Sequence, residues 1–304
     1  MPRARRRSGS PYERYFELHD SKEIRATSGK APIFSNQVLY RAIKLRILVI
    51  NDDGVYATGL WALVTALKEV GEVVVVAPDR EQSAVGSSVT LHRPLRAREI
   101  SPPVSGVLTY SVEGTPADCA ILALKNLIGS EIDLVISGIN EGANLGDDVL
   151  ISGTVGAALQ GYLNGIPSIA LSVGALEDVL FDAAARLAVV LTRLVAKGAL
   201  PKRMLLNVNL PNLPLSQIKG IELTQLGRRS YGDAIQEGHD GKRKYYWIVR
   251  QKPEWQPEEG TDIQALLNDR ISITPLHAIA TSARVLSILK ELSPAILQEL
   301  FDRG

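Results

Sequence analysis

From residue 45 onward, short apolar runs alternate with amphipathic segments. Leu45–Ile50 and Glu72–Ala77 are apolar runs of strand length, and Gly59–Val70 between them carries leucine and valine at helical spacing. This strand–helix–strand order predicts a parallel sheet with right-handed crossovers. The alternation continues, with strands predicted over 107–112, 132–137, 168–173 and 205–210 and helices over 117–128, 154–164 and 180–195.

These elements predict an α/β fold with a doubly wound, mostly parallel, Rossmann-like sheet over residues 45–225. Residues 1–44 are polar and irregular, and we expect a flexible extension there. Charge and glycine increase after Gly227, and we expect a C-terminal arm, a hairpin and helices over 226–304. Within it we expect an arm strand over 244–250, a short segment over 260–267, a strand over 271–275, a helix over 281–292 and a second helix opened by Ser293 and Pro294.

Charge and cysteine content narrow the possible functions. The formal net charge is +1, which gives no electrostatic reason to expect nucleic acid or a membrane as the main partner. The single cysteine, Cys119, allows no intrachain disulfide and fits a cytoplasmic location. With four histidines and one cysteine a zinc cluster is disfavoured, so a metal would take oxygen ligands. No apolar run approaches the roughly 20 residues that span a bilayer.

Polar residues follow the first two predicted strands directly. Asp52 and Asp53 come after the first strand, and two adjacent carboxylates repel each other unless a cation or proton lies between them. The alternative is an Asx-turn with solvated carboxylates. Ser83 follows the second strand, where its hydroxyl is either a cation ligand or a turn or cap residue.

A glycine-rich loop with two asparagines, Asn140 and Asn144, follows the strand predicted over 132–137. Its backbone N–H groups and amides suit a phosphate or the oxygen shell of a cation, although a loop without ligand is the alternative. Ser152, Gly153 and Thr154 then open a helix, whose N-terminus favours anions. Plain N-capping explains the same residues and is compatible with anion binding.

Several common catalytic motifs are absent from the sequence. There is no G-x-G-x-x-G, P-loop or G-x-S-x-G motif, and Asp52 does not begin an Asp-x-Asp pattern. The histidines stand alone, and none anchors a recognisable triad. These absences disfavour dinucleotide binding, P-loop nucleotide hydrolysis and serine-esterase chemistry.

Together, the motifs resemble those of the SurE (survival protein E) family of metal-dependent nucleotidases. The resemblance spans residues 45–276, nearly the whole organised chain, and depends on several motifs in the same order. These are RILVINDDG (46–54), VVVVAPDREQSAVG (73–86), VEGTPADCA (112–120), DLVISGINEGANLGDDVLISGTVGAALQG (133–161), PSIALS (167–172) and GTDIQALLNDRISITPL (260–276).

The resemblance implies hydrolysis of nucleoside 5′- and 3′-monophosphates to nucleoside and phosphate, with one Mg²⁺ or Mn²⁺ per subunit. It also implies a homodimer or homotetramer that exchanges C-terminal elements. It places the metal ligands at Asp52, Asp53, Ser83 and Asn140, and makes both aspartates catalytic. It assigns phosphate binding to Asn140, Asn144, Ser152, Gly153 and Thr154. Ile151 stands where many members carry an aromatic residue, and residues 1–44 have no counterpart in the usual family start.

Three other interpretations remain open from the sequence. A nucleotide-sugar-dependent transferase also uses paired aspartates for its metal, but would transfer sugar rather than release phosphate. A non-catalytic module would bind nucleotide without metal-dependent hydrolysis. The arginine-rich segment at Arg3 and 5–7 could bind RNA independently of the fold.

Overall fold

The computed structural model describes residues 44–230, 233–250, 254–255, 257–278 and 282–301. Nine strands form a central sheet in the order β3-β4-β2-β1-β5-β6-β7-β13-β8. β4, β2, β1, β5, β6 and β7 run parallel, whereas β3 and β13 pair antiparallel with β4 and β7. The strands are β1 Leu45–Ile50, β2 Gly71–Pro78, β3 Ala97–Glu99, β4 Leu108–Val112, β5 Leu134–Glu141, β6 Ser168–Val173, β7 Leu205–Leu210, β8 Ile221–Leu223 and β13 Ile271–Leu276. The predicted doubly wound, mostly parallel sheet is confirmed.

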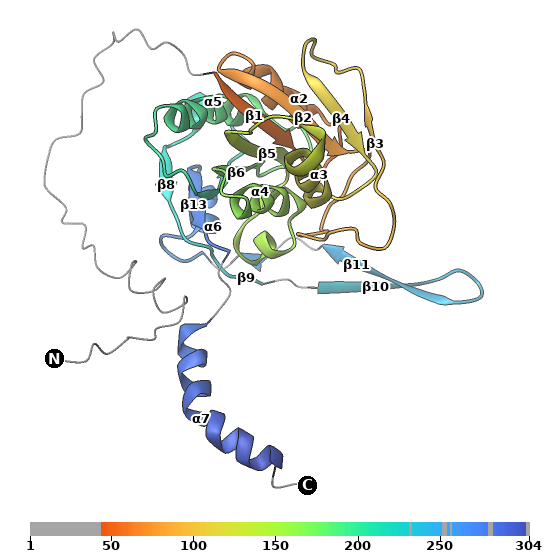
Figure 1. Ribbon diagram of the computed structural model, residues 1–304, viewed down its shortest axis with the longest axis vertical. Helices are drawn as coiled ribbons and strands as arrows, with labels where there is room; N and C mark the ends of the chain where they lie inside the picture. The colour runs from red at the N-terminus through yellow and green to blue at the C-terminus, as the bar shows by residue number, and fades with distance from the viewer. Residues whose placement is uncertain (1–43, 231–232, 251–253, 256, 279–281, 302–304) are drawn as a thin grey trace, which may run out of the picture. The chain divides into compact units, whose positions relative to one another are not determined.

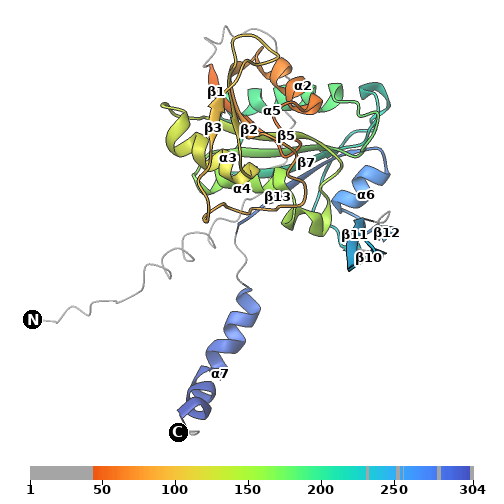
Figure 2. The same cartoon turned by 90° about the vertical axis from the view of Figure 1, so that its right-hand side faces the viewer.

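Helices cover both faces of this sheet. α2 and α5 pack on one face and α3 and α4 on the other (Figures 1 and 2). The apolar run of β1 is continuous because both faces of the strand are buried. Ile47 and Val49 pack in one core, and Leu48 and Ile50 pack in the other. The helices of the domain are α2 Thr58–Leu67, α3 Pro116–Leu122, α4 Gly153–Leu163, α5 Asp182–Ala196 and α6 Asp262–Leu267.

The order of the strands creates a crevice next to β1. From β1 the chain moves outward to β2 and β4, then crosses back to β5 on the other side of β1 and continues to β6 and β7. The winding therefore reverses between β1 and β5. In open α/β sheets, ligands bind at such a switch point, outside the carboxyl ends of the strands.

Several predicted boundaries agree closely with the structure. The strands over 45–50, 168–173 and 205–210 coincide with β1, β6 and β7. The helix predicted over 117–128 instead begins at Pro116, where Thr115 and Asp118 form a reciprocal capping box. It is α-helical only to Leu122 and continues as a π-helical turn over Ala123–Leu127.

The C-terminal part contains a hairpin of β10 (Asp233–His239) with β11 (Lys244–Arg250), and the helix α7 (Ala283–Phe301). The predicted break at Ser293 and Pro294 is wrong, because α7 runs through it. Pro294 has no N–H for the carbonyl of Lys290, and the Ser293 hydroxyl donates to that same carbonyl at 3.1 Å. The Ser293 hydroxyl thus gives the Lys290 carbonyl a hydrogen bond in place of the backbone N–H that proline lacks.

Two further small elements lie in this part of the chain. β9 (Arg229–Ser230) pairs antiparallel with β12 (Glu254–Trp255). β13 and α6 also follow residue 226, and β13 is integrated in the central sheet. The predicted extension lies outside the described residues except for Lys44, and the division of the chain at 44/45 and 225/226 stays a prediction.

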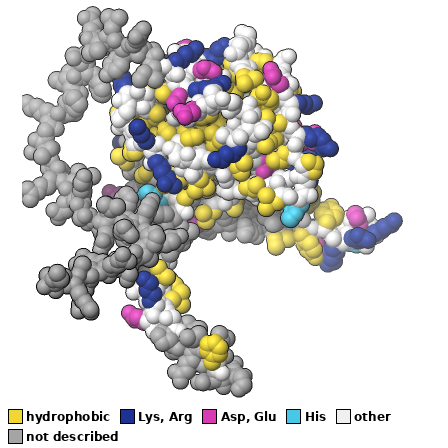
Figure 3. Space-filling model, in the orientation of Figure 1, with side chains coloured by type: hydrophobic (Ala, Val, Ile, Leu, Met, Phe, Trp, Pro, Cys, Tyr) yellow, Lys and Arg dark blue, Asp and Glu magenta, His cyan; other side chains and the backbone are white. Residues whose placement is uncertain are grey.

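Charged side chains are distributed over the visible surface of the domain. On the face seen in Figure 3, lysine and arginine are scattered among apolar and acidic side chains. None of the helices in the described ranges is long and apolar enough to cross a membrane.

Candidate active site

A narrow cleft of about 60 Å³ lies at the carboxyl-end edge of the sheet. The residues that line it come from the segments after β1, β2 and β6, from the end of β5 and the loop after it, and from the residues just before α4. They include Asp52, Ser83, Asn140, Asn144 and Ser152, five of the eight residues singled out in the sequence. The structure therefore brings together residues up to 100 positions apart at the predicted switch point.

Asp52 is buried at the end of β1 and is held by Thr154 of α4. The Thr154 N–H donates to Asp52 Oδ2 at 3.0 Å, and the Thr154 hydroxyl donates to Oδ1. Burial raises the pKa of Asp52, and these hydrogen bonds act in the opposite direction. Thr154 is fully buried, and its contacts with Asp52 support a role in positioning that carboxylate. Its expected contact with phosphate stays a prediction.

Gly153 allows α4 to start against Asp52. A Cβ at residue 153 would lie 2.9 Å from Asp52 Oδ2 and 3.1 Å from the carbonyl oxygen of Gln82. Ser152, the N-cap of α4, accepts a hydrogen bond from the Val155 N–H at 3.1 Å through its Oγ. The helix N-terminus therefore faces the cleft while Ser152 performs the capping role considered for it.

Asp53 does not line the cleft, but its carboxylate belongs to the same electrostatic cluster. Burial raises the pKa of Asp53 to about 7, with further contributions from Asp52 and Glu141. Its Oδ2 is buried and has no hydrogen-bond partner among the described residues. A carboxylate oxygen without a donor, next to other carboxylates, is the arrangement that a bound cation would stabilise.

Asn140 reaches the cleft through an irregularity in β5. The register between β5 and β6 shifts between Ser137 and Asn140. Gly138, with φ of +143°, lies where a Cβ would collide with the carbonyl oxygen of Leu171, so the close strand approach requires glycine. Asn140 Nδ2 donates to the Gly142 carbonyl at 2.6 Å, which leaves Asn140 Oδ1 as the atom available to a cation.

Ser83 lies in the loop after β2, which is tied to the first aspartate. The Gln82 N–H donates to the Asp52 carbonyl at 2.7 Å, one residue before Ser83. The exposed Ser83 hydroxyl donates to Glu81 Oε1 at 2.6 Å. A hydroxyl that donates to a carboxylate keeps its lone pairs available, which is compatible with a cation ligand.

The site has the composition expected for a hard cation. Within the described ranges, no three or more His, Cys, Asp or Glu side chains gather into a potential metal site. Asp52, Ser83 and Asn140 line the cleft and could supply oxygen ligands to a cation, together with the neighbouring Asp53. All four supply oxygen donors, which suits Mg²⁺ or Mn²⁺.

The chain is similar to proteins of a known family. Residues 47–233 match the family model described as Survival protein SurE, which covers more than half of the chain. The chain belongs to the SurE family. The resemblance inferred from the sequence motifs is therefore confirmed.

Members of the SurE family with similar sequences and structures cover most of this chain. A 5′-nucleotidase SurE from Dehalococcoides mccartyi is 52% identical over 235 residues, 77% of this chain and 89% of the relative. One from Geobacter sulfurreducens is 47% identical over 248 residues, 81% of this chain and 93% of the relative. The crystal structure of a SurE protein from Aquifex aeolicus is 42% identical, with a TM-score of 0.71 over 82% of this chain and 99% of that one.

Behind the SurE cleft, buried polar residues that the sequence analysis missed hold Asn144. Its N–H donates to Asn209 Oδ1 at 2.8 Å, and its Nδ2 donates to Ser172 Oγ at 2.8 Å. Its carbonyl accepts from Asn207 Nδ2 at 2.8 Å and Asn209 Nδ2 at 3.1 Å. The sequence did offer a signal for these residues, since two asparagines alternate within the otherwise apolar strand β7. Buried amides require hydrogen-bond partners, so a polar contact behind the sheet edge could have been expected.

Asp262 anchors the glycine-rich loop from the far end of the chain. This buried residue of α6 accepts from the Gly146 N–H at 2.8 Å and from the Gly227 N–H at 2.7 Å. Burial raises the pKa of Asp262, and the backbone donors act in the opposite direction. The motif GTDIQALL contains it, but nothing local in the sequence indicates a partner 116 residues away.

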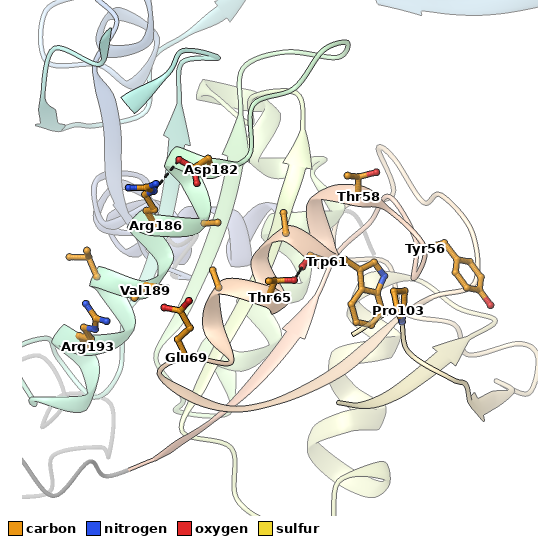
Figure 4. Close-up of a pocket in the computed structure, with 14 residues that line it drawn as sticks. Tyr56, Thr58, Trp61, Thr65, Glu69, Pro103, Asp182, Arg186, Val189 and Arg193 are labelled. Carbon is orange, nitrogen blue, oxygen red and sulfur yellow. Dashed lines mark hydrogen bonds and ion pairs between the residues drawn. The ribbon is translucent and has the colours of Figure 1, made fainter. Parts of the chain in front are cut away.

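The SurE cleft is not the largest hollow of the molecule. A groove of about 1080 Å³ lies between α2 and α5, on the face of the sheet opposite α4. Figure 4 shows Trp61 and Thr65 of α2 and Val189 and Arg193 of α5 along it. None of the eight predicted site residues lines this groove. The candidate site is therefore identified by its chemistry and its position in the fold rather than by its size.

Proposed function

We propose that this chain hydrolyses nucleoside 5′-monophosphates to nucleoside and phosphate, using a divalent cation held by Asp52, Asp53, Ser83 and Asn140. The relatives from Dehalococcoides mccartyi and Geobacter sulfurreducens, both named 5′-nucleotidase SurE, support the activity. The observation that carries the cation site is the buried, unpartnered Oδ2 of Asp53, a carboxylate whose pKa the negative charges of Asp52 and Glu141 raise further. We extend the proposal to 3′-monophosphates, and to Mg²⁺ or Mn²⁺ as the cation.

The buried carboxylates give the site its cation affinity. Asp52 is fixed by two hydrogen bonds from Thr154, so it is oriented before any ligand binds. Asp53 also accepts a backbone hydrogen bond, from Glu141, but its Oδ2 has no partner among the described residues and is left to a cation or a proton. When bound, a divalent cation supplies positive charge that offsets the negative charge of the phosphoryl group during hydrolysis.

The phosphate would lie between the cation ligands and the start of α4. Ser152 and Gly153 place the positive end of the helix dipole next to the cleft, which favours an anion. Asn144 is held by its scaffold of hydrogen bonds, so its remaining amide atoms are presented in a fixed orientation. Such fixed donors stabilise developing charge without reorganising during the reaction.

Phosphate release from a panel of nucleotides tests this proposal. Protein treated with EDTA should release no phosphate from AMP, GMP, CMP or 3′-AMP, and Mn²⁺ or Mg²⁺ should restore release. Asp53→Asn should abolish the restored activity, whereas Asp269→Asn, in an exposed ion pair with Lys219, should leave it unchanged. Equal activity with and without divalent ions, or full activity of Asp53→Asn, would contradict the assigned site.

We also propose that the chain forms a homodimer or homotetramer through its C-terminal elements. Support comes from apolar side chains exposed on α7 and on the β10–β11 hairpin, which is visible in Figure 3. On α7 these are Val285, Leu286, Ile288, Leu289 and Leu292, and on the hairpin Ile235, Tyr245, Tyr246 and Trp247. Light scattering should give two or four chains per particle, and replacing Leu286, Leu289 and Leu292 with Ser should reduce that number.

A cytoplasmic location stays a prediction.

A further inference from the structure

Two large apolar side chains line the cleft, together with two alanines, Ala84 and Ala143. Leu176, in the segment after β6, is 75% exposed, and Ile151, just before α4, is 41% exposed. An isolated exposed apolar side chain needs no explanation. Two large ones at one cleft, however, give it an apolar border next to the proposed phosphate site. A substrate whose phosphate is held in the cleft and whose remainder extends to solvent would meet exposed side chains of this kind.

The backbone at both positions is held in place. The Ile151 N–H donates to the Asp148 carbonyl at 3.1 Å, and its own carbonyl accepts from the Gly86 N–H at 2.8 Å. Before Leu176, the Gly174 N–H donates to the Leu210 carbonyl at 2.9 Å. The backbone that carries Ile151, and the backbone that leads to Leu176, would therefore need little ordering when a ligand binds.

Four polar side chains of the cleft have hydrogen-bond partners within the protein, and Glu141 and Asp148 also line it. Ser83 donates to Glu81, Asn140 to Gly142, and Asn144 to Ser172. Ser152 accepts from the backbone of its own helix. These four side chains are thus engaged in the scaffold or in the proposed cation and phosphate contacts, and the apolar border itself has no hydrogen-bond donor or acceptor.

We propose that Leu176, assisted by Ile151, is a specificity-determining residue that contacts the nucleobase and ribose of the substrate. This inference rests on the proposed nucleotidase function. Apolar side chains pack against the face of any base and carry no donor or acceptor to distinguish base edges. The border therefore favours nucleotides over phosphate esters without a base, and discriminates weakly among the bases.

Steady-state hydrolysis of AMP, CMP and ribose 5-phosphate tests this role. Leu176→Ala and Ile151→Ala should each raise KM for AMP and CMP about 3–10-fold, with kcat changed less than twofold, because packing is lost while the phosphate site is kept. The KM for ribose 5-phosphate, which lacks a base, should stay unchanged. Leu176→Phe should lower KM for AMP more than for CMP, since a purine offers a larger face for stacking. Leu163→Ala, a half-exposed leucine at the end of α4, is the matched control.

The possible outcomes separate the two proposals. If Leu176→Ala changes KM for AMP and for ribose 5-phosphate equally, or changes neither, the role of the border is wrong although the nucleotidase function stands. If the unmodified protein, loaded with Mn²⁺, hydrolyses none of the three esters, the proposed function fails and the inference fails with it.

Discussion

Thr154 donates two hydrogen bonds to the carboxylate of Asp52, one from its N–H at 3.0 Å and one from its hydroxyl. The two residues are 102 positions apart and connect the end of β1 to the first turn of α4. Both are buried, so the carboxylate has little freedom to rotate. The side chain that we assign as a cation ligand is thus oriented by a neighbour that need not touch the cation itself.

Replacing Thr154 with Val should weaken cation binding without unfolding the protein. Valine keeps the shape and the backbone donor but removes the hydroxyl donor to Asp52. The loss of a residue that orients a metal ligand typically costs about 10–100-fold in metal affinity or activity. Isothermal titration with Mn²⁺ and phosphate release from AMP would measure both quantities.

Thr192→Val is the matched control for that substitution. Thr192 is also buried, but its hydroxyl has no hydrogen-bond partner among the described residues. Removing this hydroxyl should leave cation affinity unchanged and alter the free energy of unfolding by about 1 kcal/mol or less, in the stabilising direction. Equal losses of cation affinity in both variants would show that the hydrogen bond to Asp52 is unimportant.

Gly153→Ala should abolish activity, because its Cβ would come within 2.9 Å of Asp52 Oδ2. Relief of that contact requires Asp52 or the start of α4 to move, which displaces the proposed ligand. We expect kcat for AMP to fall at least about 100-fold, as misplacement of about 1 Å at a reacting site can cost this much. Gly129→Ala, which meets no atom within 4 Å, should retain full activity.

The stability of the cation-free protein should depend on pH through Asp53. Burial raises the pKa of Asp53 in the folded protein from 3.8 to about 7, so the folded state binds this proton more tightly than the unfolded state. The group therefore contributes stability that is complete below about pH 4 and is lost as pH rises to about 7. Urea unfolding in EDTA across pH 4–8 should show this decline.

Asp53→Asn should remove the part of the decline that Asp53 causes. Asparagine stays neutral, so the cation-free variant should be more stable than the unmodified protein at pH 8. A bound Mn²⁺ favours the ionised carboxylate, so the decline should also diminish when Mn²⁺ is present. Identical pH profiles for the two proteins in EDTA would contradict the assigned pKa of Asp53.

Asp262→Asn should loosen the connection between α6 and the glycine-rich loop. One carboxylate oxygen that accepts from the Gly146 or Gly227 N–H becomes an NH₂ group, which places donor against donor in a buried position. An unsatisfied buried donor costs about 1–3 kcal/mol, measurable by urea unfolding. Asp269→Asn removes an exposed ion pair and should cost under about 1 kcal/mol. Similar losses in the two variants would argue against an anchoring role for Asp262.

The central sheet could be predicted because its strands are buried on both faces. β1, β6 and β7 are apolar runs bounded by polar or turn residues, so their limits are visible in the sequence. β3 and β8 have three residues each, largely exposed, and lack such a run. A hairpin was expected after residue 225, but the bounds of its strand β10, Asp233–His239, were not predicted, since charged and polar residues dominate it.

The cleft residues could be predicted from one principle, that parallel strands end at the same edge of a sheet. This placed Asp52, Ser83 and Asn140 together. It could not assign Thr154, whose donors are directed at Asp52, because orientation depends on packing between distant segments. The support of Asn144 by Asn209 was hidden for the same reason.

Anomalous diffraction from crystals grown with Mn²⁺ tests the central claim most directly. We predict one anomalous peak per chain, coordinated by oxygen atoms of Asp52, Asp53, Ser83 and Asn140, and no such peak in crystals of Asp53→Asn. A Mn²⁺ peak held by other residues, or none at these side chains in protein that hydrolyses AMP with Mn²⁺, would contradict the proposed site.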